Sequence, residues 1–300
     1  MPTPAHVSGI PRWLGVALIL GIAATFASNH VAARLAFDHG TNVLTAVTCR
    51  SIATAIVVWV LMRSTGVTIA LPGVKLWQAL VFGLFIAAQS VCLYAAVARL
   101  PVALALLTFN TFPVVLALVS WLSGGERPVR RVLIALPLAL FGLTLALGVT
   151  SMFSRPLDAS FAAGVGFALA ASLTFSITWV LTERWLKRVD GRMRSFTGMT
   201  VVGVVALLAG LITDGFALPH DAAGWTGLGL LTVLYGIAIT GLFVVLPKLG
   251  AVNNAALMNF EPIAALLLGW IILGQTIAPV QMLGMLIVIG AIVMVATAKH

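Results

Sequence analysis

The second half of this 300-residue chain repeats the first half without a gap. Gly15 aligns with Gly164, and every later pair keeps the same separation. Identical residues recur near the start of each half and again near its end, although the middle of each half matches poorly. A repeat half the chain long predicts two units of similar structure. The matches near the end are Leu100 with Leu249, Asn110 with Asn259, Pro113 with Pro262, Leu118 with Leu267, Trp121 with Trp270 and Gly125 with Gly274.

The composition indicates that these two units fold in a lipid bilayer. Hydrophobic residues make up 61% of the chain and charged residues only 8%, and the mean hydropathy is +1.13. Such a chain lacks the polar groups to cover its surface in water. Because the apolar runs are too long for barrel strands, and because lipid offers no partner to backbone amides, helices are required. The predicted fold class is an all-α integral membrane protein.

Ten apolar runs, separated by short breaks rich in Gly, Pro and charged residues, predict ten transmembrane helices. Five runs fall in each half, which divides the chain into an N-terminal repeat over 1–150 and a C-terminal repeat over 151–300, packed as one membrane domain. No small-residue cleavage site follows the first run, so we expect a retained helix and not a signal peptide. The runs cover residues 13–36, 41–62, 76–97, 101–123, 130–150, 159–182, 195–213, 223–246, 251–273 and 277–298.

The net charge of +9 indicates membrane topology and not a nucleic-acid partner. With a cytoplasmic N-terminus, the cytoplasmic segments hold most of the basic residues, and the outer loops hold only Arg99 and Arg155. This asymmetry follows the positive-inside rule and places both termini in the cytoplasm. The cytoplasmic set contains 13 of the 17 Lys and Arg residues: Arg12, Arg63, Lys75, Arg127, Arg130, Arg131, Arg184, Lys187, Arg188, Arg192, Arg194, Lys248 and Lys299.

An odd number of helices in each repeat means that the second repeat enters the membrane with the opposite orientation. The predicted architecture is therefore two inverted five-helix repeats. Such repeats are related by a two-fold axis in the membrane plane, and they are typical of secondary transporters that work by alternating access to a central site. A channel does not need this symmetry.

Three short motifs resemble one known family in their order and spacing. They are Ser28-Asn29-His30 followed by Arg34, Arg50 in the second run, and Gly125-Glu126-Arg127 at the end of the fourth. They are similar to motifs of the drug/metabolite transporter superfamily, in its ten-helix EamA branch, although His30 replaces an aromatic residue. Within this branch the chain is most similar to the YddG-type exporters of aromatic and other amino acids. The resemblance implies a central cavity and metabolite efflux across a bacterial inner membrane, with no cofactor.

Two charged residues, Arg50 and Glu261, fall near the middle of predicted helices, where charge is costly. Glu261 is the only acidic residue inside any apolar run. We expect an ion pair between the two; alternatively, one or both recognise the charged ends of a zwitterionic substrate. Arg34 either binds substrate or extends to the membrane surface, and His30 either titrates during transport or packs as a hydrogen-bonded residue.

The repeated Asn110-Pro113 and Asn259-Pro262 pairs predict bends in the fourth and ninth helices. Each proline should free the carbonyl four residues back and loosen its helix, so Pro113 and Pro262 are candidate hinges. Each asparagine either binds substrate or satisfies the freed carbonyl. Other polar residues inside the runs either line a cavity or join helices. The full set of candidate cavity residues is Asn29, His30, Arg34, Arg50, Gln89, Tyr94, Asn110, Thr178, Trp179, Tyr235, Asn259 and Glu261.

The scarcity of charge inside the runs also limits the function. With no Asp and one Glu there, the paired catalytic groups of an intramembrane enzyme cannot be assembled, and no metal site is expected. Phosphate-bearing substrates would need more cations, and lipophilic cations more acid. We expect an exporter of small zwitterionic metabolites, including apolar and aromatic amino acids; another metabolite or drug exporter, a channel and a lipid translocator are the alternatives. Small-molecule substrate and bilayer are the expected partners, and a monomer is compatible with this function.

Overall fold

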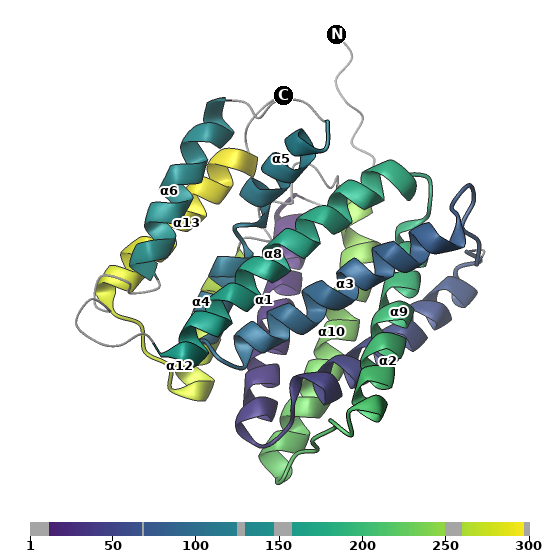
Figure 1. The fold of residues 1–300 in the computed structure, drawn as a ribbon, viewed down its shortest axis with the longest axis horizontal. Coiled ribbons are helices and arrows are strands. Elements are labelled where there is room, and N and C mark those ends of the chain that lie inside the picture. The colour runs from purple at the N-terminus through teal and green to yellow at the C-terminus, as the bar shows by residue number, and fades with distance from the viewer. Residues whose placement is uncertain (1–11, 68, 125–129, 147–157, 250–259, 297–300) are drawn as a thin grey trace.

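The computed structural model describes residues 12–67, 69–124, 130–146, 158–249 and 260–296. Every regular element in these ranges is a helix, which confirms the predicted all-α class (Figure 1). The helices are α1 (Arg12–Asp38), α2 (Val43–Ser64), α3 (Leu76–Val97), α4 (Val102–Phe109), α5 (Phe112–Leu122), α6 (Arg130–Ala146), α8 (Ala159–Trp185), α9 (Gly191–Ile212), α10 (Ala222–Leu249), α12 (Glu261–Leu273) and α13 (Pro279–Ala296).

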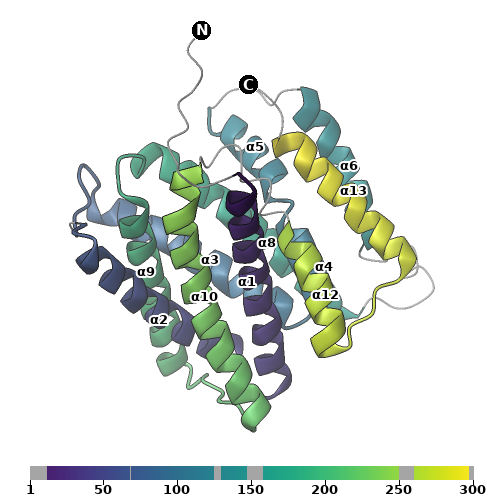
Figure 2. The ribbon, with the colours of Figure 1, turned by 180° about the vertical axis from the view of Figure 1, so that it is seen from behind.

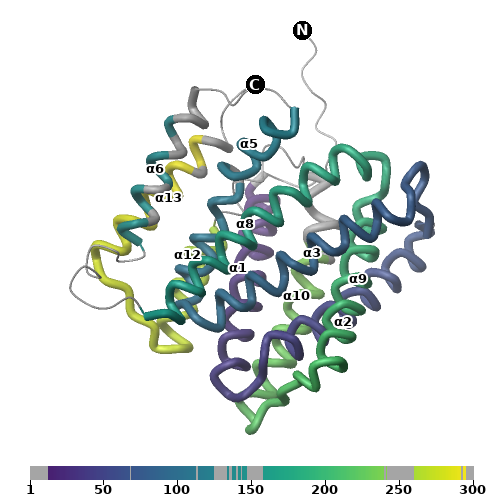
Figure 3. Tube along the Cα trace, in the orientation of Figure 1, coloured from purple at the N-terminus to yellow at the C-terminus, as the bar shows by residue number. Residues whose placement is uncertain are grey.

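Seven described segments are helical, long and apolar enough to cross a membrane, with α4 and α5 taken together as one span. Shorter apolar helices lie within α6, α12 and α13, so the number of ten spans stays a prediction. The predicted ninth run is described only from residue 260 onward, and the predicted boundary between the repeats lies outside the described residues. α4 and α5 are separate helices, joined at Asn110 and Thr111. The tube in Figure 3 follows the path of the chain, with α6 and α13 side by side at one edge of the bundle.

Polar side chains fix several helix ends. Asn42 caps α2, because its side-chain oxygen accepts a hydrogen bond from the Thr45 amide at 3.0 Å. Asp158 and Asp190 cap α8 and α9 in the same way. Each cap satisfies one of the amide groups that the first turn of a helix leaves without a partner. The breaks that the sequence predicts therefore have a defined local structure.

The packing pairs helices of one half with helices of the other. α1 packs along α10, and α8, which corresponds to α1 in the second half, packs along α3, which corresponds to α10. The corresponding helices α2 and α9 pack together, as do α6 and α13. Figure 1 shows the α6–α13 pair at one side of the bundle and the α2–α9 pair at the other, and Figure 2 shows α1 beside α10 from behind. The sequence repeat therefore has a counterpart in the packing.

Small residues allow the helices to approach closely where they pack. One large buried cluster joins α1, α3, α4, α8 and α12 and includes Ala27, Ala96, Ala168 and Ala264. Between α6 and α13 a side chain at Gly142 would not fit, because a Cβ there would lie 2.9 Å from the carbonyl oxygen of Gly284. Close approach through small residues is the usual way in which helices associate in lipid, where the hydrophobic effect does not drive them together.

Candidate functional site

Polar side chains from five helices meet inside the bundle. Four of them, Asn29, His30, Arg50 and Tyr94, are buried to between 0% and 4% exposure, and in lipid each such group needs a partner or a function. They come from α1, α2, α3, α10 and α12, so both halves of the chain contribute. We name this group the central cluster and define it as Asn29, His30, Arg50, Ser90, Tyr94, Tyr235 and Glu261.

Arg50 lies between two tyrosine rings. Its guanidinium carbon is 4.7 Å from the ring centroid of Tyr94 and 4.1 Å from that of Tyr235. One terminal nitrogen donates a hydrogen bond of 2.9 Å to Ser90 Oγ, whereas the buried Nε has no hydrogen-bond partner. A cation over an aromatic face gains about 2 kcal/mol or more when it is desolvated. The two rings therefore help to hold a positive charge inside the bundle, where Arg50 has no acidic partner among the described residues.

The predicted ion pair between Arg50 and Glu261 is wrong. The Glu261 carboxylate instead lies 3.5 Å from Nε2 of His30, and Arg50 is in none of the ion pairs of the described residues. The reason lies in the packing, since α12 packs against α1 and α4, whereas α2 packs against α9 and α10. The two charged side chains therefore approach the central cluster from different helices and find different partners.

Asn29 joins three helices of the central cluster. Its side-chain nitrogen donates to the carbonyl of Leu231 in α10, and its side-chain oxygen accepts a hydrogen bond of 3.0 Å from the Tyr94 hydroxyl. The ring of Tyr94 also meets the ring of His30 edge to face, with centroids 5.7 Å apart. Tyr94 thus contacts both His30 and Arg50, and Asn29 fixes its position.

The break between α4 and α5 differs from the predicted bend. Asn110 donates to the carbonyl of Leu106 at 2.8 Å, so the prediction that it binds the carbonyl of Phe109 is wrong. Pro113 lies in the first turn of α5, where a proline costs no hydrogen bond because the first amides of a helix have no partner in any case. The helix is therefore interrupted before the proline, and Ser176 of α8 donates to the carbonyl of Phe112 at 3.1 Å.

The corresponding region of the second half is described in part. Pro262 is the second residue of α12 and is buried, so it too lies in the first turn of a helix. Asn259 lies outside the described residues, and its predicted role stays a prediction.

Four other predicted residues lie outside the contacts of the central cluster or at its edge. Arg34 forms an ion pair of 2.9 Å with Asp38 and donates to three carbonyls between Val97 and Leu100. Thr178 donates to a carbonyl of its own helix, and Trp179 is 44% exposed. Gln89 is half-buried and lies 3.5 Å from Ser90 Oγ. Arg34 therefore joins helix ends, as a basic residue near a span end commonly does.

Sequence reasoning missed two serines that support the break in the fourth span. Ser172 and Ser176 are buried, one turn apart on α8, and face Thr111 and Phe112 respectively. Their spacing was the available signal, because hydroxyl residues four positions apart share one face of a helix.

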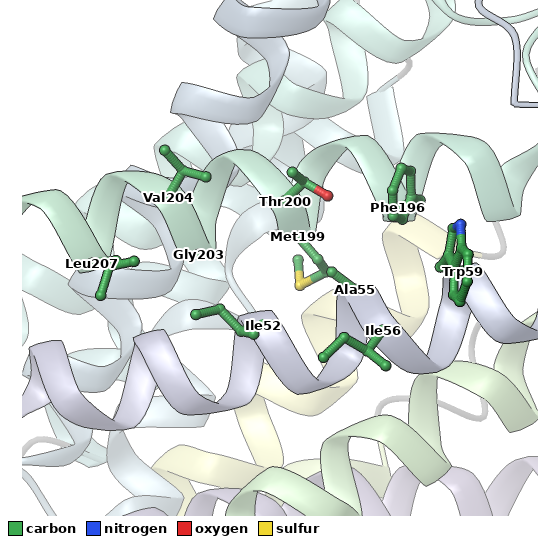
Figure 4. Close-up of a pocket in the computed structure, with 10 residues that line it drawn as sticks. All are labelled: Ile52, Ala55, Ile56, Trp59, Phe196, Met199, Thr200, Gly203, Val204 and Leu207. Carbon is green, nitrogen blue, oxygen red and sulfur yellow. The ribbon is translucent and has the colours of Figure 1, made fainter.

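The apolar groove between α2 and α9 is a different kind of feature (Figure 4). It has a volume of about 310 Å³ and is lined by side chains such as Ile52, Trp59, Phe196 and Leu207. Two of its lining residues, Ile56 and Val204, are 56% and 48% exposed, so the groove opens to the outside of the bundle. Its walls carry no charged group, which makes it unsuitable for a polar metabolite.

The sequence profile of the EamA-like transporter family matches residues 13–148 and, separately, residues 162–297. The chain belongs to the EamA-like transporter family. The family is part of the drug/metabolite transporter superfamily. Because one profile matches the chain twice, the EamA family assignment also confirms the two-repeat architecture.

Individual relatives are distant but extend over most of the chain. Protein PecM of Dickeya dadantii (strain 3937) is 27% identical over 228 residues, which cover 73% of each chain. The threonine/homoserine exporter RhtA is 24% identical in Salmonella typhimurium (strain SL1344) and 25% in Escherichia coli (strain K12), over 71% of this chain and 68% of RhtA. One solved crystal structure shares the fold, with a TM-score of 0.61 at 16% identity and coverage of 94% and 95%.

The EamA family and these exporter relatives, together with the apolar helices, support a multi-pass inner-membrane protein that exports small metabolites. They indicate a transporter and not an enzyme.

Proposed function

We propose that this EamA-family protein exports small zwitterionic amino acids, including apolar and aromatic ones, by alternating access around the central cluster. The observation that carries the proposal is Arg50, a buried cation that no acid neutralises within the described part of the chain. A guanidinium group matches a carboxylate in shape and can bind it through two parallel hydrogen bonds. Arg50 keeps one such nitrogen, Nε, without a partner.

The aromatic rings around Arg50 support the same substrate class. Tyr94 and Tyr235 both contact the guanidinium with their rings, while Phe26 meets the ring of Tyr235 edge to face at 5.7 Å. Rings in this arrangement offer an apolar wall to the side chain of an amino acid whose carboxylate faces Arg50, and they add offset or edge contacts for an aromatic side chain.

The charge of the central cluster favours a zwitterion over an ion. Arg50 is its one permanent cation and Glu261 its one acid. A substrate with one positive and one negative end leaves the buried charge balanced, whereas a nucleotide or an organic cation would add uncompensated charge in a medium of low dielectric constant. The name of RhtA as a threonine/homoserine exporter agrees with this class.

Alternating access would arise from the exchange of conformation between the two inverted repeats. The distribution of basic residues predicts the matching topology, with both termini in the cytoplasm. The interrupted fourth span and the first turn of α12 give each half a place where backbone can bend. We assign the hinge role to Pro113 and Pro262, next to these interruptions.

Uptake of radiolabelled amino acids by liposomes that contain the pure protein tests the proposal. We expect saturable uptake of threonine or phenylalanine, with competition from other amino acids. Arg50→Met should abolish it, whereas Arg63→Met, which removes an exposed arginine of the same helix, should not. Transport of a nucleotide, a lipid or an organic cation with no movement of any amino acid would contradict the assignment.

A further inference from the structure

We propose that the His30–Glu261 pair is a proton-binding site, and that this protein exchanges protons for the amino acids that it exports. The inference rests on the proposed function, and it adds the driving ion. Two observations motivate it: the pair lies inside the bundle at the junction of the two halves, and neither member has another charged partner among the described residues.

Glu261 has the surroundings of a carboxylate that changes its protonation state. Its side chain is 15% exposed, and its Oε1 lies 3.5 Å from His30 Nε2. It is the first residue of α12, and the helix dipole favours a negative charge in the first turn of a helix. A carboxylate removed from water without a Lys or Arg partner is costly, and uptake of a proton removes that cost. Both states of Glu261 therefore have a source of stabilisation.

The helices packed around His30 and Glu261 contribute few other titratable or charged side chains. α4, packed against α12, contributes no titratable side chain. On α1 the other charged residue near the pair is Arg34, which is held by Asp38 and by carbonyls at the end of α3. α3 and α10, packed against α1, contribute Cys92, Tyr94 and Tyr235, and Arg50 of α2 lies over the two tyrosine rings.

His30 holds the carboxylate of Glu261 in place and does not compete with it for the proton that the pair takes up. Its Nδ1 is buried and has no hydrogen-bond partner, which suits a neutral ring that carries its proton on Nε2 and points that proton at Glu261. A protonated ring would bury a second N–H without a partner and place a cation on Tyr94, whose ring already contacts Arg50. The proton that arrives at the pair therefore goes to Glu261.

Exchange follows from competition at one carboxylate. With an amino acid bound, its ammonium group balances ionised Glu261 and its carboxylate balances Arg50. After the amino acid leaves, a proton takes the place of the ammonium group on Glu261, so the charge on this side of the cluster is again neutral. One proton enters for each amino acid that leaves, and proton and substrate do not bind together.

Infrared difference spectroscopy of the purified protein tests the proton site without any substrate. The C=O band of a protonated carboxyl group should disappear as the pH rises. Glu261→Gln should lack this band, whereas Glu183→Gln, which replaces an acid that is 61% exposed on α8, should keep it. His30→Phe should move the pH at which the band titrates, because it removes Nε2 and keeps a ring. A band that is unchanged in Glu261→Gln would overturn the proposal.

Transport tests the coupling. The exchange of one proton for one zwitterion moves one charge across the membrane, so the membrane potential is held at zero with potassium and valinomycin. Liposomes that are one pH unit more acidic inside should then accumulate labelled threonine about tenfold. Glu261→Gln also removes the partner of the ammonium group, so slower transport is expected at every pH. The amount of threonine that this variant accumulates should in addition be the same with and without the pH gradient. Counterflow by the natural protein without any response to the pH gradient would overturn the coupling alone. If no amino acid moves at equal pH, the proposed function fails instead, and the infrared result still decides whether Glu261 binds a proton.

Discussion

Arg50 and Tyr235 lie on helices of opposite halves, α2 and α10, and the guanidinium carbon of one is 4.1 Å from the ring centroid of the other. Tyr94 covers the guanidinium at 4.7 Å from within the first half. The buried cation is therefore held between the two halves, so a rocking motion of one half against the other would change its surroundings. This relationship links the fold to the proposed transport.

The ring of Tyr235 should matter more than its hydroxyl. Tyr235→Leu removes the aromatic face and should cost about 0.5–2 kcal/mol of stabilisation at Arg50, with a higher KM for amino-acid transport. Tyr235→Phe keeps the face and should resemble the natural protein. Melting temperature in detergent and initial uptake rates measure both effects. Equal damage by the two substitutions would mean that the hydroxyl and not the ring is important.

Double-mutant cycles should separate the real pair from the pair that the sequence suggested. His30→Phe and Glu261→Gln remove two groups in contact, so their effects on the free energy of unfolding should differ from a simple sum by about 0.5–3 kcal/mol. Arg50→Met and Glu261→Gln remove groups that are not paired, so the departure of their effects from a simple sum should be smaller than for His30 and Glu261. The reverse pattern in denaturation curves would restore the Arg50–Glu261 ion pair.

Much of the fold followed from the sequence because hydropathy and the repeat act along the chain. Each predicted apolar run overlaps at least one helix, and the family profile matches both halves. Hydropathy placed Arg50 and Glu261 within apolar runs; Arg50 lies inside α2, whereas Glu261 is the first residue of α12. Hydropathy gives the depth of a residue along its helix, however, and not the neighbours of that helix. The partner of Glu261 therefore depended on the packing of α12 against α1, which no local pattern records.

The site was predicted unevenly for a similar reason. Asn29, His30, Tyr94 and Tyr235 were identified because polar residues are rare in apolar runs. Their grouping could not be predicted, since it requires the relative rotation of α1, α3 and α10. The position of the break near Pro113 was within reach of sequence reasoning, because a proline is favoured in the first turn of a helix and the interruption then falls before it.

A pH-dependent contact fixes the loop between α9 and α10 against the end of α1. Asp221 accepts a hydrogen bond from the Gly224 amide at 2.9 Å and lies 2.7 Å from His39 Nδ1. The Gly224 amide and the ring of His39 hold the pKa of Asp221 below its usual value. A lowered carboxyl pKa stabilises the fold above the pKa of the unfolded chain, and this stability is lost as the pH falls through the folded pKa.

Asp221→Ala should therefore lower the melting temperature at neutral pH, and the difference from the natural protein should shrink as the pH falls through the lowered pKa of Asp221. Asp214→Asn, which removes an acidic group from the same loop and keeps the contact between Asp221 and His39, is the matched control. Melting curves recorded across the acidic range measure this. A deficit that stays constant down to the lowest pH would show that the charge of Asp221 does not stabilise this contact.

Cysteine labelling should establish the inverted topology. Ser64 is the last residue of α2, and Thr213 directly follows α9. Both residues are exposed, and the two helices correspond to each other in the two halves. After replacement of Cys49 and Cys92 by alanine, Ser64→Cys should react with an impermeant thiol reagent from the cytoplasm and Thr213→Cys from outside. If both cysteines react from the same side, the repeats are not inverted, and alternating access by their exchange is excluded.

Counterflow in proteoliposomes tests the central claim most directly. Vesicles that contain the natural protein and unlabelled phenylalanine or threonine should trap the labelled amino acid above its equilibrium level for a time, because a carrier exchanges one molecule for another around a single site. This overshoot should saturate with concentration and be absent in Arg50→Met. Entry of label without an overshoot, or trapping of a nucleotide, lipid or organic cation in place of every amino acid, would contradict the account.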